Sequence, residues 1–425
     1  MSRKFRFQRL AIACMLGGVA SAASADVVYG DQAREAFAAR QALLAGILDA
    51  SPKGKVSADT LFQNSFEVAA SSQQNCDSDR DGDGLPDCVE TNTGRFVSVS
   101  DTGTDPDHAD TDGDGLRDGE EVLGAETGLD LPALGVSPLR RDLLIEYDWF
   151  DSSYDCGPHS QRPTAAIAAR VAAMFASAPV LNPDGSSGIN VIQDYGQGGL
   201  FVGGNRIEGH DAILPGSLDA TFHQIKNENF DPARLGYFRY VMMPHRYNGG
   251  SSSSGYAEIV GDDAIVSLYC QNSESNVART IAHEVGHLLG LHHGGFEECN
   301  NKPNYNSLMN YRYQFQGVDT QCDAQGDFAA DDFSRGDRLS LDENALREPQ
   351  GVCGNPAIDW NRDGTLQEGL AMDLNPNDAA TCGTAMRKLD DFDDWANLTF
   401  AGVLDFKGQL KSVQSETGCA GAPVH

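Results

Sequence analysis

Basic residues are scarce in this chain. Its 425 residues include 31 Lys and Arg against 62 Asp and Glu, which gives a formal net charge of −31. Nucleic-acid binding needs a positively charged surface to meet the phosphates, and docking on an anionic membrane needs one as well. The charge balance therefore argues against both partners. Hydrophobic residues make up 40% of the chain, which is enough for a packed core and excludes global disorder.

Long apolar runs are also missing. After residue 25 no stretch reaches the roughly 18 apolar residues of a membrane helix, so no membrane span is expected. Residues 1–25 hold four basic residues, a shorter apolar run over 10–20 and an A-x-A site at 23–25. This order is typical of a secretory signal peptide, and a buried N-terminal helix is the alternative. We expect a secreted protein, either extracellular or, in a Gram-negative source where export stops there, periplasmic.

The C-x-x-C spacing of zinc knuckles and redox sites is absent. Of the ten cysteines, Cys14 falls in the expected signal peptide, which leaves an odd number for the exported chain. Export makes disulfides the default interpretation, although sequence alone does not fix their connectivity. Near neighbours suggest the pairs Cys76–Cys88, Cys299–Cys322 and Cys353–Cys382. At least one thiol then stays free, pairs between chains or is otherwise engaged.

Residues 76–126 form an acidic block with 16 Asp and Glu against three Arg. Such a run is often a solvated linker, but here the acids follow the D-x-D-x-D-G calcium-loop register twice. Positions 1, 3, 5, 7, 9 and 12 are filled by Asp79, Asp81, Asp83, Leu85, Asp87 and Glu90 in the first loop, and by Asp110, Asp112, Asp114, Leu116, Asp118 and Glu121 in the second.

This register suits calcium because a hard cation takes six to eight oxygen ligands. Alternate side chains supply them, glycine at position 6 permits the sharp turn, position 7 offers its backbone carbonyl, and the final Glu binds through both oxygens. We expect Ca²⁺ in both loops. The stretch 104–116 resembles thrombospondin type 3 repeats, and that resemblance implies that Asp105 and Asp107 join the sites.

A third, weaker copy of the loop lies near the C-terminus, with Asp359, Asn361, Asp363 and Gly364 in register. Its position 12 is a leucine, which cannot ligate. Either Asp373 replaces that ligand or the loop is structural only.

Residues 138–312 alternate between strand and helix patterns. Strands are expected at 142–149, 188–193, 238–243, 256–260 and 264–269. Helices are expected over 163–175 and from Ser275 or Asn276 to Leu289, where Gly290 ends the second one. This order predicts an α+β protein whose upper part is α/β-like.

The second of these helices carries the motif HEVGHLLGLHH. His283 and His287 lie one helical turn apart, so both imidazoles face the same side. Gly290 permits a turn that brings His293 back as a third ligand. Three neutral imidazoles leave the fourth zinc position open, as catalytic zinc requires. Glu284 is placed to act as general base on a metal-bound water.

His292 is a fallback ligand whose spacing from the glycine is one residue short. The full motif H-E-x-x-H-x-x-G-x-x-H, followed by Met309 in the segment 307–311, resembles the metzincin clan of zinc endopeptidases. The resemblance implies a twisted mixed sheet, an active-site helix, and a Met-turn that places Met309 beneath the metal. It also implies that Tyr311 reaches the zinc or the oxyanion, and that an edge strand near 256–260 pairs with extended substrate. The glycines after His293 identify no subgroup.

The sequence therefore divides into five segments. They are a signal peptide (1–25), a helical segment that is a pro-segment or a packing arm (26–75), the calcium-binding repeats (76–126), a zinc metalloprotease domain (138–330) and a C-terminal extension with the third loop (331–425). The expected function is a secreted zinc endopeptidase that acts on protein or peptide substrates. The alternatives are a calcium-binding adhesion or matrix protein whose peptidase domain is secondary or inactive, and a zinc hydrolase of another amide, such as a cell-wall peptide.

Overall fold

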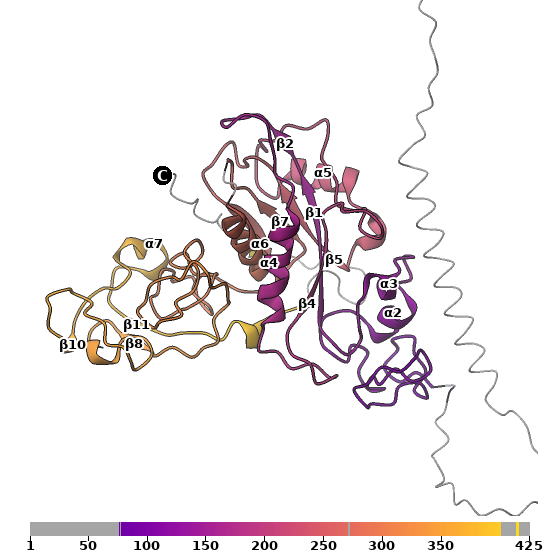
Figure 1. Cartoon of the computed structure of the whole chain (residues 1–425), viewed down its shortest axis with the longest axis horizontal. Coiled ribbons are helices and arrows are strands. Elements are labelled where there is room, and N and C mark those ends of the chain that lie inside the picture. The colour runs from indigo at the N-terminus through magenta and orange to yellow at the C-terminus, as the bar shows by residue number, and fades with distance from the viewer. Residues whose placement is uncertain (1–75, 77, 271–272, 401–413, 416–425) are drawn as a thin grey trace, which may run out of the picture.

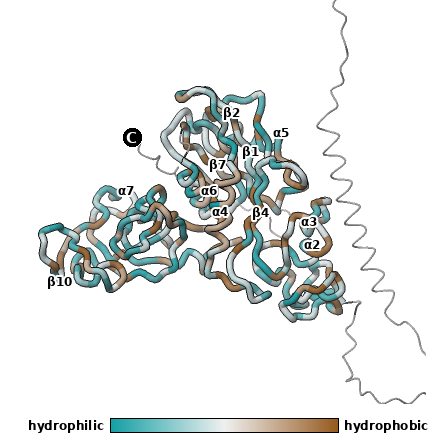
Figure 2. The backbone as a smooth tube through the Cα atoms, viewed as in Figure 1, coloured by the Kyte–Doolittle hydropathy of each residue, from teal (hydrophilic) through white to brown (hydrophobic). Residues whose placement is uncertain are grey.

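The computed structural model describes residues 76, 78–270, 273–400 and 414–415. The expected signal peptide, the expected helical segment 26–75 and Cys419 lie outside these residues. Within them, no helix is both long and apolar enough to cross a membrane. Hydrophobic residues are spread in short stretches over the described part of the chain (Figure 2).

A six-stranded mixed sheet forms the centre of the molecule (Figure 1). Its order is β12 (Gln414–Ser415), β6 (Gly255–Ile259), β7 (Asp263–Val266), β5 (Phe238–Met243), β1 (Asp142–Trp149) and β4 (Asn190–Asp194). The strands β4, β1, β5 and β7 are parallel, and β6 runs antiparallel to β7. The α+β class and the mixed sheet are confirmed. The strand β6 is not outermost, because β12 pairs with it at Glu258 and Ile259.

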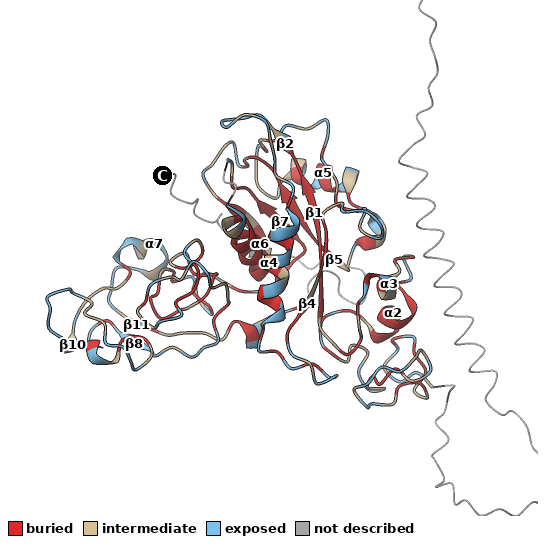
Figure 3. Ribbon diagram, viewed as in Figure 1, coloured by how far each residue is buried: buried red, intermediate tan, exposed pale blue. Residues whose placement is uncertain are grey.

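Both faces of the sheet are covered, which is why every residue of β1 is buried. On one face, Leu143 and Ile145 pack with the helices α4 (Ala165–Ala176) and α6 (Glu274–Leu288). On the other face, Leu144 packs with α5 (Ala220–Asn229). Figure 3 shows this burial concentrated in the strands and in α6. The helix α6, which carries the histidine motif, is thereby fixed against the sheet.

Most expected elements of this domain are present, with the strands at 142–149 and 238–243 matching to the residue. The helix α4 starts at Ala165 because Thr164 caps it, its hydroxyl accepting from the Ile167 N–H. The helix α5 was not expected. Its apolar pattern is limited largely to Phe222 and Ile225, and its start depends on the cap Asp219.

The remaining elements are short. They are α2 (Asp118–Leu123), α3 (Leu131–Leu134), β2 (Asp151–Ser152), β3 (His159–Ser160), β8 (Leu341–Asp342), β9 (Leu346–Arg347), β10 (Glu368–Leu370), α7 (Ala379–Cys382), β11 (Lys388–Leu389) and the 3₁₀ turns at Pro232–Arg234, Glu348–Gln350, Pro376–Asp378 and Trp395–Asn397. The acidic block from residue 78 to α2, which we call the acidic module, lies together with α3 at one end of the described residues. The segment from β8 to β11 lies at the other end (Figure 1). Phe333, Trp395 and Phe400 nonetheless belong to the same core as α6.

Four disulfides connect the described residues. The pair Cys76–Cys88 is confirmed. The other two predicted pairs are wrong, because the C-terminal extension folds back over the segment after α6 and pairs Cys299 with Cys382 and Cys322 with Cys353. A fourth pair, Cys156–Cys270, spans 114 residues. Disulfides in this number are typical of extracellular proteins.

Candidate active site

The C-terminal end of α6 determines how the chain turns back and brings His293 toward His283 and His287. Gly290 has φ +92°, a left-handed conformation that a residue without Cβ adopts at little cost. Its N–H donates to the His287 carbonyl at 2.8 Å, and the Leu291 N–H donates to the Gly286 carbonyl at 2.9 Å. These two bonds form a Schellman motif, which terminates the helix and reverses the chain toward His293.

The three motif histidines meet at one buried point. Nε2 of His287 lies 3.2 Å from Nε2 of His283 and 3.1 Å from Nε2 of His293. Nδ1 of His283 contacts the Leu308 carbonyl at 2.8 Å, and Nδ1 of His287 contacts the Leu291 carbonyl at 2.7 Å. A carbonyl only accepts, so each Nδ1 carries the proton and each Nε2 presents its lone pair.

This tautomer makes the cluster a fit for a metal ion. Two neutral rings protonated at Nδ1 cannot donate to one another through Nε2, so their converging lone pairs repel unless a cation lies between them. Burial lowers the pKa of His283 to about 4. Burial and the neighbouring imidazoles hold the pKa of His293 well below its usual value. His283 and His293 are thus neutral at pH 7, the state in which an imidazole ligates zinc.

Glu284 is fully buried and follows His283 directly in α6. Its carboxylate lies against Gly255 at the start of β6, where an added Cβ would overlap it. The Gly255 carbonyl is held by the hydroxyls of Tyr247 and Ser253. The side chain of the expected general base therefore lies between α6 and β6, the strand expected to bind substrate.

Met309 packs against α6, and Tyr311 lies beside the histidine cluster. Met309 is fully buried, and an added Cβ at Gly286 of α6 would overlap its sulfur. The Tyr311 ring centroid is 4.4 Å from that of His293 and 5.9 Å from that of His283. His292, the fallback ligand, contacts Glu298 through Nδ1 at 2.5 Å.

Asp394 anchors the turn that carries Met309, a role the sequence did not reveal. It is fully buried and accepts from the Tyr305 hydroxyl at 2.8 Å, the Ser307 hydroxyl at 2.5 Å and the Ser334 N–H at 3.0 Å. Burial raises the pKa of Asp394 to about 7. The acidic aromatic stretch 389–395 was visible in the sequence, but nothing in its pattern indicates this contact.

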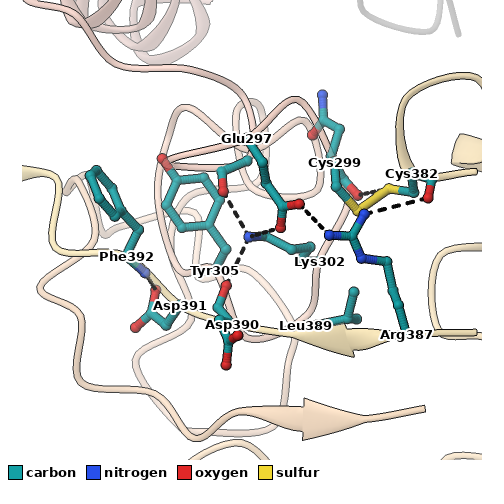
Figure 4. Close-up of polar contacts among 12 residues, drawn as sticks. Glu297, Cys299, Lys302, Tyr305, Cys382, Arg387, Leu389, Asp390, Asp391 and Phe392 are labelled. Carbon is teal, nitrogen blue, oxygen red and sulfur yellow. Dashed lines mark hydrogen bonds and ion pairs between the residues drawn. A yellow bond between two sulfur atoms is a disulfide. The ribbon is translucent and has the colours of Figure 1, made fainter. Parts of the chain in front are cut away.

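Lys302 anchors the loop that follows His293 (Figure 4). Its buried ammonium donates to the Gly294 carbonyl at 2.7 Å and to the Asp390 carbonyl at 2.8 Å, and it pairs with Glu297 at 3.2 Å. Arg387 contacts the same glutamate. One lysine thus fixes the backbone next to His293 to the C-terminal extension.

Replacing Lys302 by Met should therefore weaken zinc binding by about tenfold, because supporting contacts orient the ligands. The measurement is competition with a chromogenic zinc chelator. The control is Lys388→Met, which removes an exposed lysine from β11, the strand just before Asp390. Equal zinc affinity in both variants would contradict the anchoring role.

Both acidic loops adopt the same turns. The position-1 carboxylates of Asp79 and Asp110 each accept from the N–H of position 4, at 2.8 Å. The position-9 carboxylates of Asp87 and Asp118 each accept from the N–H of position 2, at 3.0 and 2.9 Å. Leu85 and Leu116 are buried, and their N–H groups donate to position 5. Two clusters of converging carboxylates result, Asp79–Asp81–Asp83 and Asp110–Asp112–Asp114.

The position-12 acids are buried in two further clusters, Asp83–Glu90–Asp118 and Asp114–Glu121–Asp142. Burial and neighbouring carboxylates raise the pKa of Glu90 to about 8 and hold the pKa of Glu121 well above its usual value. Asp105 contacts His108, and Asp107 pairs with Arg80.

In the third loop the Asp359 carboxylate accepts from the Gly364 N–H at 2.8 Å, and residues 361–366 are exposed. Asp373, its candidate ligand, accepts from the Asn375 N–H at 3.0 Å.

Comparison with known proteins gives no match, whether to a protein-family model, a curated protein or a solved structure.

Proposed function

We propose that this chain is a secreted, zinc-dependent endopeptidase. The observation that carries the proposal is the convergence of three buried, neutral imidazoles through Nε2, with Glu284 adjacent. Three nitrogen ligands are typical of catalytic zinc, whereas structural sites are closed by a fourth protein ligand. The four disulfides support export.

Zinc, when bound, lowers the pKa of a water ligand to about 7 and polarises the substrate carbonyl. The residues of the chain contribute proton transfer to the proposed reaction. Glu284 takes a proton from the water as its oxygen bonds to the carbonyl carbon, and delivers it to the amine nitrogen as the C–N bond breaks. The Tyr311 phenol, beside His293, donates a hydrogen bond to the oxygen that gains charge. Burial of Glu284 excludes bulk water from this transfer.

An extended peptide is the substrate shape that fits. The strand β6 accepts an added antiparallel strand, since β12 of the same chain pairs with its far end at Glu258 and Ile259. Gly255, at the near end, lies against Glu284. A peptide paired along this end by main-chain hydrogen bonds would bring its scissile bond to the base.

The test is hydrolysis of casein or gelatin by the purified protein, with and without a zinc-selective chelator. Cleavage that stops on chelation and returns on adding zinc is expected. A zinc-loaded protein that cleaves neither substrate would favour the adhesion-protein alternative. Activity confined to cell-wall peptides would favour the other amide hydrolase.

We also propose that the two acidic loops bind Ca²⁺ and stabilise the protein. Within the described residues, Glu90 and Glu121 are buried and have carboxylate oxygens with no hydrogen-bond partner. A buried charge in this position needs a cation. Hard oxygen ligands in the calcium-loop register favour Ca²⁺ over zinc.

Replacing Tyr311 by Phe should lower kcat by about 10²–10³-fold and leave KM nearly unchanged, because a hydrogen bond to the developing charge acts mainly in the transition state. Steady-state kinetics on a fluorogenic peptide measure both constants. A change limited to KM would assign Tyr311 to binding or packing instead.

A further inference from the structure

The two acidic loops make one equivalent contact with the segment that follows each of them. In the first loop, Asp83 accepts from the Leu85 N–H at 2.7 Å and from the Gly119 N–H at 2.8 Å. In the second loop, Asp114 accepts from the Leu116 N–H at 2.8 Å and from the Asp142 N–H at 2.7 Å. The first loop is thereby joined to the second loop, and the second loop is joined to the strand β1.

Each following segment also contributes a carboxylate to the cluster. Asp118, next to Gly119, lies with Asp83 and Glu90, and Asp142 lies with Asp114 and Glu121. In each cluster the three ligand atoms are within 4.8 Å of one another, and all the residues are buried. Asp142 lies outside both calcium-loop motifs, because it is the first residue of the strand β1.

Glu121 independently indicates a ligand at the second cluster. It is 2% exposed, and within the described residues neither of its carboxylate oxygens has a hydrogen-bond partner. The charged groups that act on it are carboxylates, those of Asp114, Asp112 and Asp142 among them. An acid buried among acids is stable only if it is protonated or if a cation lies between them.

We propose that Asp142 is a ligand of the calcium ion held by the second loop, so that one ion joins the acidic module to the first strand of the catalytic sheet. This inference rests on the proposed binding of calcium by the loops. The hydrophobic contacts agree with it, since Leu116 of the second loop shares a core with Leu144 of β1. Leu85 of the first loop belongs to a separate cluster with α2.

The consequence is that calcium stabilises the catalytic sheet as well as the module. Asp142 also accepts from the Ser137 N–H at 2.7 Å and from the side-chain amide of Asn190, its neighbour on β4. A bound ion would therefore fix the β1–β4 pair at the end where the module attaches. Without the ion, three buried carboxylates would repel one another at that junction.

The experiment uses the full chain carrying Glu284→Gln, which prevents self-cleavage, and compares Asp142→Asn with Asp79→Asn. Asp79 is position 1 of the first loop and lies outside the second cluster. Calcium is titrated calorimetrically after chelation, and unfolding is followed with and without millimolar calcium. Asp142→Asn should weaken one calcium site by about tenfold or more and remove most of the calcium-dependent rise in the unfolding temperature of the sheet. Asp79→Asn should weaken the other site and keep most of that rise.

Unfolding in the calcium-free samples shows whether Asp142 acts as a calcium ligand or only as a hydrogen-bond acceptor. If Asp142 is a ligand, Asp142→Asn should lower the unfolding temperature much more in calcium than in chelator, where only its contacts with Ser137 and Asn190 are weakened. Unchanged calcium affinity, or an equal fall in unfolding temperature with and without calcium, would overturn the inference. If Asp142→Asn does not fold, Glu121→Gln takes its place and must lower the unfolding temperature of the sheet in calcium but not in chelator. If Glu121→Gln does not show this difference, the inference is overturned as well. A parent that binds no calcium would refute the proposed calcium loops themselves.

Discussion

Replacing Glu284 by Gln should lower kcat by about 10²–10⁴-fold while zinc content and folding stay unchanged. The amide keeps the shape of the side chain against Gly255 but cannot accept the proton from the attacking water. The imidazoles that would hold the metal are unchanged, so only proton transfer is lost. The measurement combines peptide hydrolysis, zinc content by atomic emission and thermal unfolding.

A control on the same helix is Glu274→Gln. Glu274 is the exposed first residue of α6, where its carboxylate accepts from the Thr164 hydroxyl at 2.9 Å. It undergoes the same change in charge and shape, and its variant should keep full activity. Near-normal turnover of Glu284→Gln in a clean, zinc-loaded preparation would remove Glu284 from the mechanism and direct the search to another base.

Local spacing determined the features of the site that could be predicted. His283 and His287 are fixed by the helical period, and His293 follows from the left-handed turn at Gly290. Likewise, the position-1 and position-9 hydrogen bonds of the acidic loops close within seven residues. In such cases a short motif carries nearly all the geometric information.

Contacts between residues far apart in the sequence could not be predicted in the same way. Lys302 meets a carbonyl 88 residues away in Asp390, and Asp394 accepts from Ser307 at a separation of 87 residues. The pairing of Cys299 with Cys382 depends on the same return of the C-terminal extension. Asp142 was expected only as the first residue of a strand, because no local pattern indicates that it meets Glu121. Each of these contacts requires the tertiary fold.

Removing calcium should destabilise the protein most at high pH, and this is the second large effect expected. In the calcium-free protein, burial raises the pKa of Asp83 and Asp118 to about 7 and that of Glu90 to about 8, above their unfolded values near 4. The folded state then binds more protons than the unfolded state between about pH 4 and pH 8. By linkage, the free energy of unfolding falls as pH rises through this window, by up to about 1.4 kcal/mol per group and pH unit.

Calcium should reverse this dependence, because it binds the ionised carboxylates and competes with protons for them. The stabilisation by calcium should therefore be large at pH 8, smaller at pH 5 and absent near pH 4. Thermal unfolding and limited proteolysis of the Glu284→Gln protein at pH 5 and pH 8, each with millimolar calcium or with a chelator, measure it. Replacing Asp83 and Asp114 by Ala should reproduce the calcium-free behaviour at any calcium concentration, since both are central ligands in their clusters. If the unfolding midpoint and the cleavage pattern at pH 8 are the same with and without calcium, the acidic block is a solvated linker and the calcium loops are refuted.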